Sequence, residues 1–137
     1  MPQRRRGTNK ISSLCLLGFF VAALAGCHRE SDVDVRITHE IAPQPPRVGN
    51  AIITLGVTDA SGEPVTGGQL KLEGNMSHAG MVPVFADAAE VSPGRYRANL
   101  ELTMAGDWVV IIHGALADNR KFEQEFELAV NNADGVK

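Results

Sequence analysis

The chain has 137 residues, with 13 basic and 16 acidic side chains and a formal net charge of −3 at pH 7. This length accommodates one domain together with a leader or a tail. An acidic balance argues against nucleic acid or an anionic membrane surface as the binding partner, because both carry negative charge.

The first 26 residues have the features of an export signal. Four basic residues lie among the first ten, and an apolar run (11–24) follows that is too short to span a bilayer comfortably. The sequence LAGC (24–27) then resembles a bacterial lipobox, which implies cleavage before Cys27, acylation of Cys27 and firm membrane anchoring. The alternatives are an ordinary secretory signal with a chance cysteine, or twin-arginine export, although RRRGTNK lacks apolar residues after its arginine pair.

Cleavage would change the charge and the chemistry of the chain. The leader holds four basic residues and no acidic one, so the 111-residue remainder keeps nine basic and sixteen acidic residues, a net charge of −7. Cys15 leaves with the leader and Cys27 is acylated, so no thiol remains for a disulfide, a thiolate metal site or catalysis. Met1 leaves as well, and the remaining methionines are Met76, Met81 and Met104.

After a short tether (27–32), the pattern of the chain has a period of two, which is typical of strands, and no helical stretch is expected. The expected strands are 33–39, 51–59, 69–74, 82–91, 95–102, 107–113 and 121–130. Three prolines within 42–50 separate the first two. Segment 107–113 is almost wholly apolar, as in a central strand covered on both faces, and residues 131–137 form a frayed tail.

Seven short strands separated by turns predict an all-β domain over residues 33–130. The spacing is typical of an immunoglobulin-like β-sandwich of about seven antiparallel strands. A domain of this size buries enough apolar surface to be stable without disulfides.

Strand direction predicts which loops meet. If the strands alternate up and down, the connections after the first, third and fifth strands share one pole. The sequence NMSHAGM (75–81) forms the third connection and TMAGDW (103–108) forms the fifth. Every methionine of the mature chain and one histidine should therefore gather there: Met76, His78, Met81 and Met104. His39 closes the first strand and is expected near the same pole, whereas His113 should lie at the opposite one.

These residue types favour copper. Thioether sulfur is soft and neutral and prefers Cu(I) over zinc, calcium or magnesium, and imidazole binds either copper state. Thioethers also form no disulfides in an oxidising compartment. Gly80 allows the loop to curl around a common point, and Trp108 could cover an ion with its ring face.

Each candidate has a structural alternative. Met104 continues the inward parity of strand 95–102, so it could simply plug the end of the sandwich, and Met76 and Met81 could fill gaps. His78 could be a solvated loop residue and Trp108 a core residue.

The sequences NMSHAGM and PGRYRANLELTMAGDWVVIIH, with PPRVGNAIITLGVTDASGEPV upstream, resemble the YtkA-like domain family, which is related to FixH-like domains. The resemblance covers roughly residues 41–130 and implies a small immunoglobulin-like sandwich, often exported or lipid-anchored, beside envelope copper-handling components. The Met/His loop of the family corresponds to Met76, His78 and Met81, and its Met-x-Gly-x-Trp corresponds to Met104, Gly106 and Trp108. Many members carry Met-x-x-Met-x-His, whereas here the second methionine follows the histidine.

The leading functional hypothesis is a non-enzymatic, lipid-anchored domain that binds copper, preferentially Cu(I), and holds or passes it in the bacterial cell envelope, facing the periplasm or the outside. Its partners would be the membrane and an envelope copper-handling or transport protein. The alternative is a metal-free interaction module of an envelope complex. An enzyme is disfavoured, because Ser77 beside His78 makes no triad and the chain has no phosphate-binding glycine motif.

Overall fold

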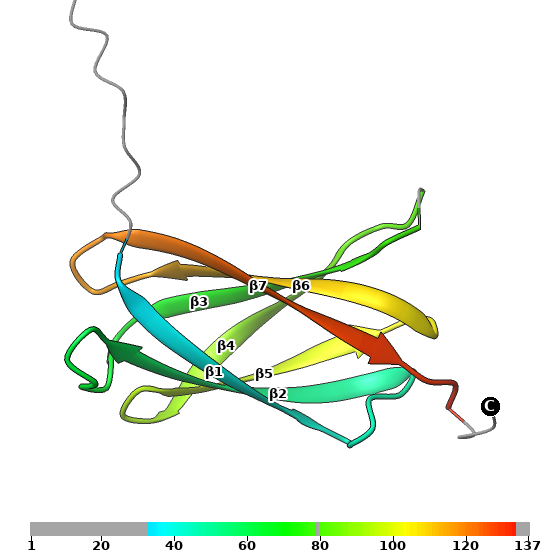
Figure 1. The fold of residues 1–137 in the computed structure, drawn as a ribbon, viewed down its shortest axis with the longest axis horizontal. Coiled ribbons are helices and arrows are strands. Elements are labelled where there is room, and N and C mark those ends of the chain that lie inside the picture. Colours follow the sequence, from blue (N-terminus) through cyan, green and yellow to red (C-terminus); the bar gives the residue numbers. More distant parts are fainter. Residues whose placement is uncertain (1–32, 79, 134–137) are drawn as a thin grey trace, which may run out of the picture.

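The alternation of apolar and polar residues becomes strand structure along nearly the whole described chain. The computed structural model describes residues 33–78 and 80–133 (Figure 1). The strands are β1 (Val35–Ala42), β2 (Gly49–Asp59), β3 (Gln69–Met76), β4 (Val84–Ser92), β5 (Arg95–Leu102), β6 (Gly106–Ala115) and β7 (Lys121–Val130). All strand pairings are antiparallel, so the all-β prediction is confirmed.

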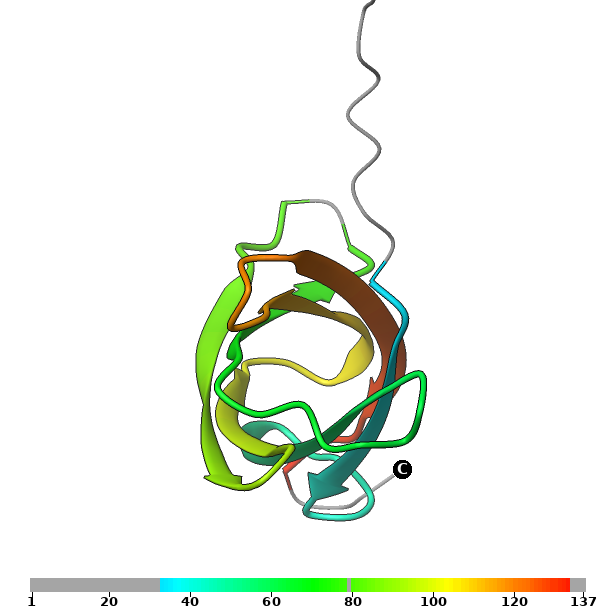
Figure 2. The ribbon, with the colours of Figure 1, turned by 90° about the vertical axis from the view of Figure 1, so that its left-hand side faces the viewer.

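The strand order is that of an immunoglobulin-like sandwich. One layer is β1-β2-β5-β4 and the other is β3-β6-β7, which matches the ABED and CFG sheets of that fold. Strand β4 joins the layers, because its residues 84–88 pair with β3 whereas 89–92 pair with β5 across a register shift. The strands therefore form one continuous order, β1-β2-β5-β4-β3-β6-β7, which curls around the core in the end-on view of Figure 2.

The core is made by the inward side chains of both layers. In β5 burial alternates strictly, with Tyr96, Ala98, Leu100 and Leu102 inside. No charged or polar residue of ranges 33–78 and 80–133 is classed as buried apart from tyrosine and tryptophan, whose polar atoms are hydrogen-bonded. Each fully buried aliphatic side chain contributes about 1.5–3 kcal/mol, so the sandwich needs no disulfide.

Two expectations about the strands are corrected. β6 is central in its layer, between β3 and β7, but it is covered on one face only. Its even-numbered residues from Trp108 to Gly114 are buried, whereas Val109, Ile111 and His113 are half-buried on the outer face. β1 also continues to Ala42, because pairing with β2 persists until the prolines begin.

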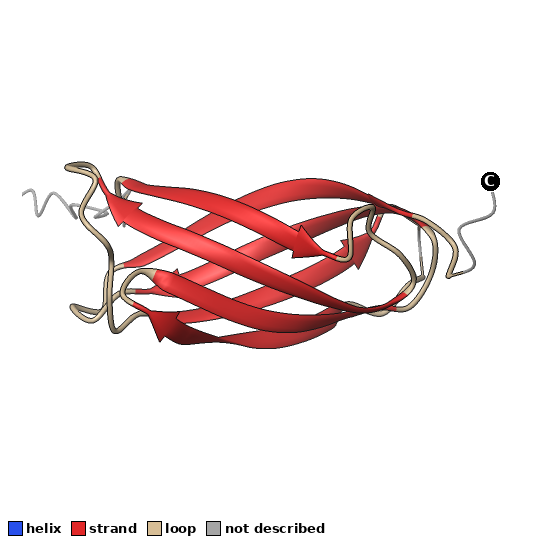
Figure 3. Ribbon diagram, turned by 90° about the horizontal axis from the view of Figure 1, so that it is seen from below, coloured by secondary structure: helices blue, strands red, loops and turns tan. Residues whose placement is uncertain are grey.

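The connections gather at two ends of the sandwich, as Figure 3 shows. The methionine pole comprises connections 43–48, 77–83 and 103–105 with the adjoining strand ends. The N-terminal pole comprises connections 60–68, 93–94 and 116–120 together with the start of β1. Within the described ranges there is no helix long and apolar enough to cross a membrane.

Candidate functional site

The sequence pattern predicts Met76 in the loop, but in the structure Met76 lies at the end of a strand. It is the last residue of β3, paired with Trp108 of β6, and its half-buried side chain packs against the core. A Cβ atom at Gly106 would lie 3.1 Å from the Met76 terminal methyl, so this side chain lies over the start of β6. Packing therefore holds the Met76 thioether close to Gly106 and Trp108, the residues that form the floor of the methionine pole.

Met104 lies on the surface in the turn between β5 and β6. Its side chain is 49% exposed, so the interpretation of Met104 as a plug is wrong. The inward parity of β5 ends at Leu102, where the strand ends, and Trp108 fills the end of the sandwich. Trp108 is 1% exposed, and its indole Nε1 donates a 3.0 Å hydrogen bond to the Met104 carbonyl. The tryptophan thus positions the methionine backbone from within the core.

The connection between β3 and β4 is fixed mainly at its start. The Ser77 backbone N–H and the Ser77 hydroxyl both donate to the Asp107 carbonyl, at 3.3 and 3.1 Å. His78 is exposed, and the Met81 side chain is 37% exposed. Gly80 has a φ of +88° with open space around it, a conformation that glycine adopts without strain. The loop therefore exposes the His78 imidazole and the Met81 thioether, which are the candidate metal ligands, to solvent.

The strand directions bring Met76, Met81, Met104 and His78 to the methionine pole, as the alternation predicted. They do not bring His39 there. His39 sits in the middle of β1 opposite Leu55, and its ring stacks on Phe126 with centroids 4.0 Å apart. The candidate donors are thus three thioethers and one imidazole from two connections and one strand end.

His113 belongs to a separate cluster on the outer face of the β3-β6-β7 layer. Its Nε2 lies 2.9 Å from a Glu73 carboxylate oxygen and its Nδ1 lies 3.0 Å from one of Glu123. Hydrogen bonds from the Asn75 amide and from His113 hold the pKa of Glu73 below its usual range. Because each imidazole nitrogen faces a carboxylate, this cluster ties three strands together.

The donor chemistry of the methionine pole fits a soft ion. Among the described residues no group of three or more histidine, cysteine, aspartate or glutamate side chains is arranged to hold a metal. The neutral thioethers and the imidazole of His78 would suit Cu(I), which needs neither carboxylates nor a rigid geometry, and would not suit zinc, calcium or magnesium. The residues at this pole could therefore hold a soft monovalent cation.

Two carboxylates beside the loop were not predicted from the sequence. Asp107 and Glu127 line a surface depression of about 400 Å³ together with Ser77 and the edge of Trp108. Among the described residues neither carboxylate forms an ion pair. The only signal in the sequence was the position of Asp107 between Gly106 and Trp108, because the proximity of Glu127 depends on the β6–β7 register.

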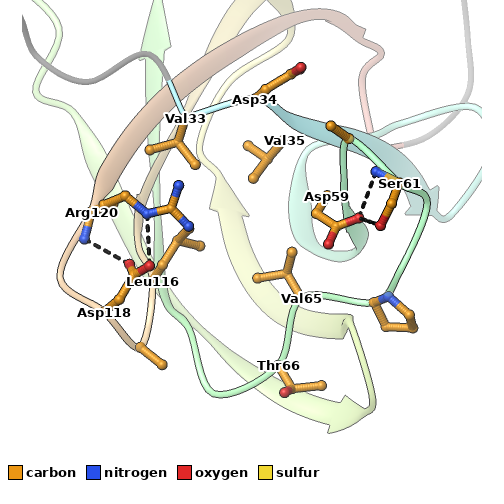
Figure 4. Close-up of a pocket in the computed structure, with 13 residues that line it drawn as sticks. Val33, Asp34, Val35, Asp59, Ser61, Val65, Thr66, Leu116, Asp118 and Arg120 are labelled. Atoms are coloured by element: carbon orange, nitrogen blue, oxygen red, sulfur yellow. Dashed lines mark hydrogen bonds and ion pairs between the residues drawn. The ribbon is translucent and has the colours of Figure 1, made fainter.

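The N-terminal pole holds a larger depression of about 550 Å³ (Figure 4). Its floor is apolar, with Val33, Val35 and Leu116 almost fully buried. On one wall the Arg120 guanidinium is paired with Asp118 at 2.7 Å. On the other wall Asp59 accepts hydrogen bonds from the hydroxyl and backbone of Ser61. The charged groups of this depression are therefore largely satisfied within the fold.

Comparisons with known proteins identify a family. The sequence model of the YtkA-like family matches residues 28–113, which include the Met/His loop and the Met104–Trp108 turn. No curated protein matches the chain. Among solved structures, murine CRIg is similar over 71% of this chain and 98% of its own, at 10% identity and a TM-score of 0.41.

Proposed function

The chain belongs to the YtkA-like family, and we propose that it is a lipid-anchored envelope protein that binds copper, preferentially Cu(I), to hold it or pass it on. The ligands are the thioethers of Met76, Met81 and Met104 and the imidazole of His78. The family match brings no enzymatic activity with it, and the proposed role is non-enzymatic.

The observation that supports this proposal most is the gathering of soft donors. All three methionines that follow Cys27 lie at one pole, although 28 residues of sequence separate Met76 from Met104. Two of them expose their side chains to solvent, which is unusual for residues whose only task is to fill a core. An exposed donor set suits a site that must exchange its ion.

The chemistry of the four proposed ligands determines their protonation and the net charge of the copper site. The three thioethers carry no proton to lose, so only His78 must be in its neutral form to bind. Because the thioethers add no charge, the bound Cu(I) keeps its positive charge, which nearby Asp107 and Glu127 stabilise at longer range.

A competition titration with Cu(I) tests the proposal. A soluble form starting at residue 28 is titrated against a chromophoric Cu(I) chelator, beside a variant with Met76, Met81 and Met104 all changed to leucine. Leucine keeps the apolar bulk and removes the sulfur, so the variant should fold and lose at least tenfold in affinity. His78→Ala should weaken binding, whereas the matched control His39→Ala should not. Unchanged affinity in the triple leucine variant contradicts the copper site.

The second candidate function is a metal-free interaction module of an envelope complex. The observation in its favour is that four large apolar side chains at or near the same pole are exposed: Met81, Val82, Phe85 and Met104. A group of exposed apolar side chains is typical of a protein contact. The same titration separates the candidates, because a purely apolar surface needs no sulfur and binds no Cu(I).

The lipid anchor has its own test. Mass spectrometry of the chain purified from bacterial membranes should find residue 27 as the acylated first residue. Cys27→Ala should abolish that modification and leave the leader uncleaved. An unacylated residue 27 in the natural chain purified from membranes would contradict the lipidation.

A further inference from the structure

We propose that the methionine pole is a docking surface for a protein partner with an apolar centre and a basic rim, and that the domain presents this pole to water, away from the membrane. This inference rests on the lipid anchor of the proposed function. It does not rest on copper binding. Three features of the molecule support it: the length of the tether, the distance between the poles, and the different surfaces of the two poles.

The tether fixes which pole is near the membrane. Cys27 precedes Val33 by six residues, which span at most about 20 Å even when fully extended. Val33 is 8% exposed, and its carbonyl accepts a 2.8 Å hydrogen bond from the Val35 N–H at the N-terminal pole. An acyl group on Cys27 therefore holds the N-terminal pole within about 20 Å of the lipid headgroups.

The methionine pole lies at the other end of the sandwich. β6 connects the two poles in a single strand of ten residues, a length of about 30 Å at the usual rise per residue. In Figure 1 the start of β1 is at the left, and connections 77–83 and 103–105 are at the right. With the N-terminal pole held at the surface, the methionine pole projects into the aqueous phase.

The two poles also differ in the surfaces that they expose. The large exposed apolar side chains of the described residues are Ile52, Met81, Val82, Phe85, Val91 and Met104. Four of the six belong to connection 77–83, the adjoining start of β4 and the β5–β6 turn, and Val82 is 82% exposed. Near the N-terminal pole only Val91 of this set is exposed, two residues before connection 93–94, and the walls of the depression in Figure 4 carry charged and hydroxyl groups. The N-terminal pole can therefore rest at a headgroup surface without inserting into it.

The charged residues beside the exposed apolar side chains indicate which charge the partner should carry. On the β6–β7 side of the loop the exposed charges are Asp107 and Glu127, which form no ion pair among the described residues. On the β3–β4 side, in contrast, the Lys71 ammonium lies 5.2 Å from the Phe85 ring centroid, and exposed Arg47 belongs to connection 43–48. An apolar centre with a polar rim is the usual anatomy of a protein interface. Lysine or arginine on the partner would complement the acidic β6–β7 side of this surface, where anionic phospholipid would be repelled. Methionine adapts its shape to different surfaces, which suits a transient contact.

The orientation is tested on the full lipidated chain in vesicles of phosphatidylethanolamine and phosphatidylglycerol, without copper. The mature chain has no other free thiol, so Ala60→Cys at the N-terminal pole and Val82→Cys at the methionine pole can each carry one donor dye. With acceptor dye on the lipid headgroups, the label at residue 60 should show several-fold more energy transfer than the label at residue 82. Lengthening the tether by a Gly/Ser segment should remove the difference. Equal transfer with the natural tether, or greater transfer from residue 82, would overturn the orientation.

The rim is tested with a synthetic peptide of alternating leucine and lysine, added to the same chain labelled for NMR. Saturable amide shifts centred on residues 77–83 and 103–107, weakened by salt and by Asp107→Asn with Glu127→Gln, would support the docking surface. Shifts centred on Glu123 and Glu125, at the other end of β7, or no shifts, would overturn it. Both experiments are free of metal, so their failure would leave the Cu(I) titration unaffected, and a failed titration would leave them intact.

Discussion

The two poles of the sandwich are built on opposite principles. At the N-terminal pole the loops are tied down by side chains. Glu90 accepts hydrogen bonds from the Gly67 and Gly94 backbones, Tyr96 donates to the Val65 carbonyl, and the Gly68 N–H donates to the Tyr96 hydroxyl. Asp59 accepts a further set from its own turn. These bonds fix the conformation of connections 60–68 and 93–94.

At the methionine pole the comparable connection is left free of such bonds. Of the described residues in 77–83, only Ser77 forms hydrogen bonds, both to the Asp107 carbonyl. The candidate ligands His78 and Met81 are exposed, and the buried Trp108 side chain packs beneath them in the end of the core. Connection 43–48 of the same pole is bonded, because the Val48 N–H donates to the Asn131 carbonyl and the Asn131 N–H donates to the Pro46 carbonyl. The contrast is therefore between connection 77–83, whose described residues form few hydrogen bonds, and the connections of the N-terminal pole.

The largest expected effect is on the floor of the methionine pole. Trp108→Ala removes the largest fully buried side chain and the hydrogen bond to the Met104 carbonyl. It should destabilise the fold by about 3–5 kcal/mol, as measured by urea unfolding followed by circular dichroism. Trp108→Phe, which keeps most of the volume, is the control and should cost clearly less. Equal, small losses in both variants would mean that the floor is not rigid.

A glycine pair separates backbone strain from the position of Met76. Gly106 and Gly49 both have positive φ, +135° and +116°, so alanine at either should cost about 1–3 kcal/mol. Only at Gly106 would the new methyl meet the Met76 side chain, whereas nothing lies near Gly49. Gly106→Ala should therefore also weaken Cu(I) binding, and Gly49→Ala should not. A loss of binding in both variants would show that strain alone accounts for it.

The polar ties of the N-terminal pole can be weakened one at a time. Tyr96→Phe removes a hydroxyl that bonds both Val65 and Gly68, and it should cost about 1–2 kcal/mol. Amide hydrogen exchange of Gly68 should become faster, while Cu(I) affinity stays as it is in the unmodified chain. If affinity falls with this change, the two poles are coupled and the contrast between them fails.

Acid should weaken the N-terminal pole. The Ser61 hydroxyl and the Glu63 N–H hold the pKa of Asp59 below its model-compound value of 3.8, and Arg120 does the same for Asp118. A folded-state pKa below the unfolded value adds stability that is complete above the unfolded pKa and is lost as pH falls through the folded pKa. Asp59→Asn should therefore flatten the loss of stability below about pH 4. A loss of stability in acid that is equally steep in Asp59→Asn and in the unmodified chain would contradict this role of Asp59.

The smallest effect should come from the exposed sulfurs. Met81→Leu with Met104→Leu should change the free energy of unfolding by no more than about 0.5 kcal/mol, because both side chains lie on the surface. Chemical denaturation measures this change. A loss of several kcal/mol would show that these residues are structural and would remove the reason to regard their exposure as functional.

The fold could be predicted from the sequence because the alternation of apolar and polar residues is visible within each single strand. Period-two patterns in 95–102 and 121–130 specify which face of each strand is buried, and the structure has the same strand bounds there. The pole of the methionines followed from alternating strand direction. The exposure of Met104 and the position of His39 could not be predicted, because they depend on which side chain fills the end of the core and on how far β1 pairs with β2. Met104 is exposed because Trp108 occupies the end of the core, and His39 lies far from the methionine pole because β1 continues three residues beyond it.

The most direct test of the central claim uses the methyl groups of the three methionines that follow Cys27 as probes. In the soluble form labelled with carbon-13 at the methionine methyls, three resonances should be visible. One equivalent of Cu(I), kept reduced, should shift all three together with the ring signals of His78 and leave the ring signals of His39 in place. Absence of any shift, or a shift of Met81 alone, would contradict a site in which thioethers from separate segments of the chain hold one ion.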